Sequence, residues 1–135
     1  MVNRLSNNPI LDTDSYKASH WLQYPSDVSS MYSYFESRGG RYRDIVFFGL
    51  QYYLEEYLSA SIIHEHVDEA ERFFVAHGEP FNREGWDYLI DTYGGHFPVR
   101  IRAVPEGTIV PSGNVLFDIE LAVPVTHIWF YKCMP

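Results

Sequence analysis

Apolar residues recur with a helical period in three stretches of the chain. An apolar residue at every third or fourth position predicts helices over 45–58, 65–77 and 83–93. Gly78 follows the second of these helices and is expected to end it, because glycine readily adopts the left-handed conformation found after helices. Asn82 is the candidate N-cap of the third helix, since its side chain can accept a hydrogen bond from a free backbone N–H.

Three other stretches alternate between apolar and polar residues, a pattern typical of strands. They cover 31–37, 99–104 and 115–121, and the segment 107–117 is expected to form a hairpin-like turn before the last of them. Strands flank a block of helices without a regular strand–helix alternation. The sequence therefore predicts an α+β fold, with a mostly antiparallel sheet flanked by about four helices.

The fourth helix is short and is predicted over 15–23, near the start of the chain. Asp14 is among the residues that favour its N-cap, and Pro25 cannot continue it. At 100° per residue, the stripe expected to face the core holds Ala18, Trp21 and Leu22. Tyr16 and His20 fall on the opposite side. Tyr16 is therefore an aromatic residue on a face that the core does not need.

Composition limits the kind of protein that this can be. The chain has 135 residues, 46% of them apolar and 17% aromatic, so we expect one globular domain with a substantial core. A net charge of −8 argues against a general partner of nucleic acid or anionic membranes. No apolar run reaches the roughly 18 residues that a membrane helix needs, and the N-terminus lacks the apolar core of a signal peptide. The lone Cys133 excludes an internal disulfide, which makes a cytoplasmic location the expectation.

Three arginines and two glycines lie together in the segment 38–43 of this otherwise acidic chain. Glycine lets a backbone approach a ligand closely, and arginine matches two phosphate oxygens at once. A solvated connection with surface arginines explains the same composition. Both interpretations stay open on composition alone.

The segment His64-Glu65-His66 resembles a fragment of a metal site. Residues two apart do not share a face of a helix, and no third ligand is evident nearby. A solvated helix start is the better interpretation, and no metal site is predicted. The chain also offers no Ser/His/Asp or Cys/His arrangement, Walker motif or dinucleotide fingerprint.

Taken in order, six segments resemble the N-terminal domain of the nicotinamide phosphoribosyltransferase family. They are TDSYK (13–17), QYP (23–25), YSYFESR (32–38), FFGLQYYLEEYL (47–58), GWDYLIDTYGGHFPVRIRAVPEG (85–107) and PSGNVLF (111–117). The resemblance covers about 9–121 and implies that 1–121 form a domain like that of a type II phosphoribosyltransferase. The family's α/β barrel, with most of its catalytic apparatus, does not follow. The segment 122–135 diverges from the family pattern and looks like a truncated or frame-shifted reading of a longer enzyme.

The resemblance also implies an activity. The family transfers phosphoribose from phosphoribosyl pyrophosphate to the pyridine nitrogen of nicotinamide, which makes nicotinamide mononucleotide for NAD salvage. Phosphoribosyl pyrophosphate is used with Mg²⁺, and ATP can stimulate the reaction. We expect this portion of the enzyme to bind no cofactor itself. The family forms head-to-tail dimers, so a homodimer or docking to a barrel domain is the expected association.

Three residues of this chain match positions to which the family gives a role in substrate binding. Tyr16 matches the tyrosine that stacks on the nicotinamide ring, and Arg38 matches an arginine that approaches the substrate phosphates. Asp14 matches an aspartate at the same subunit interface. All three would act in trans, in a site completed by another subunit, and no catalytic residue is assigned to this chain. The alternative is a stand-alone interaction or regulatory module that keeps the fold without catalysis.

Overall fold

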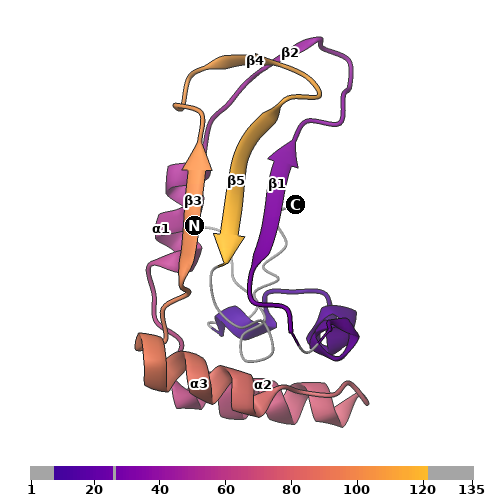
Figure 1. Cartoon of the computed structure of the whole chain (residues 1–135), viewed down its shortest axis with the longest axis vertical. Helices are drawn as coiled ribbons and strands as arrows, with labels where there is room; N and C mark the ends of the chain where they lie inside the picture. Colours follow the sequence, from indigo (N-terminus) through magenta and orange to yellow (C-terminus); the bar gives the residue numbers. More distant parts are fainter. Residues whose placement is uncertain (1–7, 26, 122–135) are drawn as a thin grey trace.

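Helices form two groups around a central sheet in the computed structural model, which describes residues 8–25 and 27–121. The helices are, in chain order, the 3-10 helices η1 (Pro9–Leu11) and η2 (Ser15–Gln23) and the α-helices α1 (Leu50–Leu58), α2 (His64–Ala76) and α3 (Arg83–Tyr93). The helices α2 and α3 run side by side at one end of the molecule, and α1 lies beside the sheet (Figure 1). All four predicted helices are present, and the α+β class is confirmed. The divergent segment 122–135 lies outside the described residues.

The sheet is antiparallel, with strand order β1-β5-β3. It is formed by β1 (Met31–Glu36), β5 (Val115–Leu121) and β3 (Val99–Ala103), as the alternating patterns predicted. A separate two-stranded ribbon of β2 (Asp44–Val46) and β4 (Ile109–Pro111) arches over one end of this sheet (Figure 1). The segment 107–117, predicted as a hairpin-like turn, contains β4 and links two different sheets, because β4 pairs with β2 and not with β5.

The helix predicted from Ile45 was wrong over its first turn. Strand β2 occupies this stretch, and Phe47 extends the pairing by donating its N–H to the carbonyl of Thr108 at 2.9 Å. Gly49 then adopts a φ of 102°, in the left-handed region that favours glycine, and α1 begins at Leu50. The Glu106 carboxylate accepts a hydrogen bond from the backbone N–H of Gln51 at 2.8 Å. A side chain from the β3–β4 connection thus provides a partner for one of the N–H groups that the first turn of α1 leaves free.

Two clusters of buried apolar residues hold the fold together. One joins the two long helices to η1 and to the end of β5; its buried members are Ile10, Ile62, Val67, Ala70, Phe74, Leu89 and Leu121. The other lies between α1, the ribbon and one face of the sheet, with Phe47, Leu50, Val110, Leu116 and Phe117 buried. The inward positions predicted for the second helix, Val67, Ala70 and Phe74, are confirmed.

Candidate functional site

The helix η2 differs from the predicted helix in its period, and this difference decides which side chains it exposes. A 3-10 helix has 3.0 residues per turn, so residues three apart stand in one row. Ala18 and Trp21 share such a row and are half-buried, as predicted. Leu22 was expected beside them but is 58% exposed, because it stands in the row of Tyr16. Tyr16 is 57% exposed, which confirms that its ring faces away from the core.

Asp14 and Lys17 form an ion pair at the start of η2. The Lys17 Nζ lies 3.0 Å from the Asp14 Oδ2, and the Lys17 N–H donates to the Asp14 carbonyl, also at 3.0 Å. The lysine side chain is only 6% exposed, whereas that of the aspartate is 61% exposed. Asp14 is the N-cap residue, yet its side chain makes no capping hydrogen bond. Its carboxylate is directed to the lysine instead.

The Tyr16 ring has two cationic or aromatic neighbours on its own helix. The Lys17 Nζ lies 5.6 Å from the ring centroid, within the range of a cation–π contact. The His20 ring lies 5.4 Å away, with its plane inclined by 53°. The tyrosine is thus flanked by polar groups while more than half of its surface stays open. That arrangement suits stacking on a flat heteroaromatic ring.

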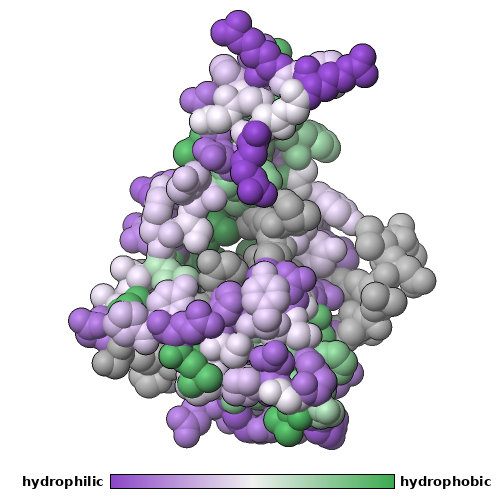
Figure 2. Space-filling model, turned by 90° about the vertical axis from the view of Figure 1, so that its right-hand side faces the viewer, coloured by the Kyte–Doolittle hydropathy of each residue, from purple (hydrophilic) through white to green (hydrophobic). Residues whose placement is uncertain are grey.

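Arg38 lies in the connection that leaves β1, and its side chain is exposed. The connection is fixed at both ends by turns of the β4–β5 link: Gly113 donates to the carbonyl of Ser37 at 2.9 Å, and Ser112 donates to that of Arg43 at 2.9 Å. Figure 2 shows strongly hydrophilic side chains projecting from the same end of the molecule. The two interpretations of 38–43 both remain compatible with this exposed, anchored loop.

Tyr16 and Arg38 lie at opposite ends of β1. In Figure 1, η2 lies near the start of this strand, and the connection that holds Arg38 leaves its far end. A strand of six residues spans roughly 20 Å. The chain therefore does not bring the two side chains together around one small group. They can serve one ligand only if it has a ring at one end and phosphates at the other.

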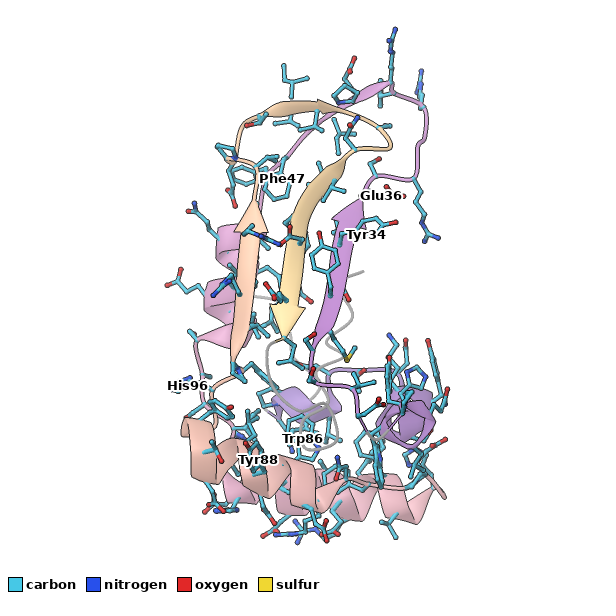
Figure 3. All side chains as sticks on the ribbon, in the orientation of Figure 1. Tyr34, Glu36, Phe47, Trp86, Tyr88 and His96 are labelled. Carbon is cyan, nitrogen blue, oxygen red and sulfur yellow. The ribbon has the colours of Figure 1, made fainter. Side chains whose placement is uncertain are left out.

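The sheet face between these two ends is polar and open. Tyr34 lies on this face of β1 and is 58% exposed; Figure 3 shows its side chain beside Glu36 near the end of the strand. Arg102 of β3 donates to the Asp118 carboxylate of β5 at 2.9 Å, and the hydroxyl of Tyr32, also in β1, donates to the same carboxylate at 3.3 Å. Partial loss of hydration raises the pKa of Tyr32, and the charge of Asp118 and its hydrogen bond to the hydroxyl raise it further.

The histidine pair of the predicted helix start opens α2, as expected. His64 contacts Asp87 of α3 at 3.3 Å, and the His66 ring nitrogen accepts the N–H of Ile63 at 3.4 Å. Within 8–25 and 27–121, no three His, Cys, Asp or Glu side chains gather in a way that could hold a metal ion. In the same part of the chain, no helix has the length and apolar run needed to cross a bilayer.

Comparison with known proteins decides the family. Residues 8–101 match the family model described as "Nicotinamide phosphoribosyltransferase, N-terminal domain". The chain belongs to this family. A protein of Xanthomonas campestris pv. campestris named nicotinamide phosphoribosyltransferase is 53% identical over 114 residues, which are 84% of this chain and 24% of the relative. A protein of the same name from Acinetobacter baylyi is 31% identical over 121 residues, and this match covers 76% of this chain and 24% of that relative.

This member of the nicotinamide phosphoribosyltransferase family thus spans about a quarter of the length of the curated relatives that it matches. Its described part contains all three residues to which the resemblance gave a role. Sequence reasoning assigned no role to Lys17, although the Asp-x-x-Lys spacing of Asp14 and Lys17 is visible in the motif. Residues three apart are neighbours in an α-helix as well, so the spacing alone allows this ion pair, but it does not predict that the lysine is buried.

Proposed function

We propose that this domain supplies Tyr16, Asp14 and Arg38 to the active site of a nicotinamide phosphoribosyltransferase. The reaction joins nicotinamide to phosphoribosyl pyrophosphate, forming nicotinamide mononucleotide and pyrophosphate. The observation that carries the proposal is the Tyr16 ring, which is 57% exposed at the start of η2 and lies beside the Lys17 ammonium. The family membership supplies the ligand class for that ring.

Each residue has a role that its chemistry supports. Tyr16 would stack on the pyridine ring of nicotinamide, a contact worth about 0.5–1.5 kcal/mol beyond area burial. The Arg38 guanidinium would bind the pyrophosphate through paired hydrogen bonds. These bonds would stabilise the negative charge that builds on this leaving group as its bond to the ribose breaks. Asp14 stands at the same end as Tyr16, with most of its side chain open to a ligand.

The separation of Tyr16 from Arg38 supports a site that is shared with another domain. An extended substrate complex has its aromatic ring and its diphosphate at opposite ends, and β1 would run alongside it. We propose that a barrel domain of a second subunit faces this edge of the molecule and carries the catalytic groups. Mg²⁺ would enter with phosphoribosyl pyrophosphate as part of the substrate. A polypeptide of these 135 residues alone is expected to make no nicotinamide mononucleotide.

A hybrid enzyme tests the proposal. Residues 8–121 of this chain would replace the matching part of the Xanthomonas campestris relative, and product formation would be measured with each substrate varied in turn. Tyr16→Ala is expected to raise the KM for nicotinamide roughly tenfold or more, because stacking and burial are both lost. Tyr52→Ala is the matched control, since Tyr52 is 59% exposed on α1. Equal kinetics for the two variants would remove Tyr16 from the site.

A second candidate function is the stand-alone interaction module. The observation that favours it is the apolar surface of the ribbon, where Val46, Phe48 and Ile109 are 62%, 82% and 69% exposed. The hybrid enzyme separates the two functions. If the hybrid folds but makes no product, while the unmodified relative is active under the same conditions, the interaction module is favoured.

A further inference from the structure

Lys17 is a buried charge in an otherwise ordinary helix start. Among the described residues, Asn8 and Lys17 are the polar or charged residues buried from solvent, and Lys17 is 7% exposed. Lysine is almost never buried without a partner, because removing an ammonium from water is costly. Burial of this side chain therefore needs a compensating contact, and the structure shows what that contact is.

A compensating group is the Asp14 carboxylate, and the backbone N–H of Lys17 also donates to the main-chain carbonyl of Asp14. The side-chain ion pair and the backbone hydrogen bond, each 3.0 Å long, connect the same two residues. Side chains three residues apart lie above one another in a 3-10 helix, which brings Asp14 and Lys17 together. The Asp14 side chain does not make the capping hydrogen bond that an N-cap aspartate usually makes. The lysine thus fixes one carboxylate oxygen, while the aspartate side chain as a whole remains 61% exposed.

The same ammonium also lies against the Tyr16 ring. A cation 5.6 Å from the ring centroid is attracted by the π-electrons and restricts where the ring can lie. One buried group therefore contacts both side chains that the proposed function places at the nicotinamide end.

We propose that Lys17 is a positioning residue of the nicotinamide end of the site. Its ammonium holds the Asp14 carboxylate and the Tyr16 ring in the orientation in which both face the ligand. Lys17 itself does not touch the substrate, because only 6% of its side chain is exposed. This inference rests on the proposed function of Tyr16 and Asp14.

The test uses the hybrid enzyme and measures the KM for each substrate, kcat and Tm. Lys17→Met keeps the length of the side chain and removes its charge. The expected result is a rise in the KM for nicotinamide on the order of tenfold, with the KM for phosphoribosyl pyrophosphate nearly unchanged. Lys17→Arg should restore part of the nicotinamide affinity, because the cation is kept with a different shape. An unchanged nicotinamide KM in Lys17→Met would overturn the inference.

Two controls separate positioning from general destabilisation. Asn8→Ala removes the other buried polar side chain, which bonds to the His66 carbonyl of α2 and has no role in the Tyr16 site. It should lower Tm without changing the nicotinamide KM, and an equal rise of that KM in Asn8→Ala would overturn the positioning role. In a double-mutant cycle, Asp14→Asn should make Lys17→Met less harmful, because the lysine acts partly through the aspartate. Full additivity would contradict the coupling.

Failure of this inference is distinguishable from failure of the proposed function. If Tyr16→Ala impairs nicotinamide use and Lys17→Met does not, only the positioning role is wrong. If Tyr16→Ala has no effect, the proposed function fails first, and the lysine is then a structural ion pair of η2.

Discussion

The carbonyl of Gly95 accepts a hydrogen bond from the N–H of Ile62 at 2.9 Å, and no side chain fits between the two residues. This contact joins the end of α3 to the segment that leads into α2. A Cβ at position 95 would overlap the backbone carbonyl of Ile62, a residue that is 1% exposed. The close approach explains why the chain needs glycine at this point.

Gly95→Ala is therefore expected to destabilise the fold strongly. The clash with the Ile62 backbone adds to the cost of a left-handed residue, since φ is 78°. Gly94→Ala is the matched control, because Gly94 is also left-handed but a Cβ there meets nothing within 4 Å. We expect the control to cost about 1–2 kcal/mol and Gly95→Ala to cost clearly more in chemical denaturation. Equal losses would show that the Ile62 contact is not restrictive.

Arg38→Ala in the hybrid enzyme is expected to raise the KM for phosphoribosyl pyrophosphate and to lower kcat, with Tm unchanged. The side chain is exposed, so its removal leaves no cavity, but the proposed grip on the pyrophosphate is lost. Arg38→Lys should recover only part of the loss, because a point charge replaces a planar fork. Arg72→Ala, which removes an exposed arginine of α2, serves as the control. Similar kinetics for Arg38→Ala and Arg72→Ala would exclude Arg38 from the site.

Arg83 connects α3 to three carboxylates and is expected to stabilise the helix pair. It contacts Asp68 at 2.7 Å, Glu71 at 2.6 Å and, more weakly, Asp87 at 3.4 Å. Hydrogen bonds to Glu71 and Asp68 are the main causes that raise the pKa of the Arg83 guanidinium. Arg83→Met leaves these acids to repel one another.

The measurement is Tm by circular dichroism at low and high salt. Arg83→Met should lower Tm more at low salt than at high salt, because salt screens the remaining repulsion. Arg100→Met is the control, since Arg100 is 75% exposed and lies 3.8 Å from Glu120, a longer ion pair than those of Arg83 with Asp68 and Glu71. A drop in Tm for Arg100→Met as large as that for Arg83→Met would contradict a special role for the Arg83 network.

Stability is expected to fall at alkaline pH, and Tyr53 contributes to the fall. Burial is the first cause that raises the pKa of Tyr53 above 10.0, followed by the neighbouring Tyr57 and Asp12. Between the unfolded and the folded pKa, the unfolded chain binds fewer protons than the folded one, so the free energy of unfolding decreases as pH rises. The contribution is complete below pH 10 and is lost above it.

Urea denaturation from pH 8 to above pH 10 checks this expectation. Tyr53→Phe removes the ionisable group while keeping the ring that packs against Tyr57 at a centroid distance of 4.4 Å. The variant should lose less stability over the alkaline range than the wild type. A parallel decline in both proteins would assign the alkaline sensitivity to other groups, such as Tyr32 and Tyr93, whose pKa values are also raised.

The 135-residue chain is expected to self-associate through the ribbon. Val46 pairs with Ile109 across the ribbon, and Phe48 lies two positions further along the chain; all three apolar side chains are exposed. Phe48→Lys should lower the apparent mass in light scattering. Phe73→Lys is the control, because Phe73 is 52% exposed on α2. A wild-type chain that is monodisperse and monomeric at tens of micromolar would contradict the expectation.

The sequence by itself determined the elements whose stability is local. Helix α3 has the bounds that its apolar period predicted, and the Asn82 side chain caps it by accepting the Gly85 N–H at 3.1 Å. The strands of the main sheet also follow their alternation. These elements could be predicted because the period of their apolar residues and, for α3, the capping residue are visible within a short stretch of sequence.

Tertiary structure decided the rest. Ile45 and Val46 fit the apolar period of the predicted helix, yet they belong to β2 because β4, more than sixty positions later, supplies the partner strand. The 3-10 period of η2 exposes Leu22 and buries Lys17, and the direction of β1 separates Tyr16 from Arg38. The choice of partner strand, the type of helix and the direction of a strand depend on contacts between segments that are distant in the sequence. The free energy of those contacts cannot be predicted from a local pattern of residues.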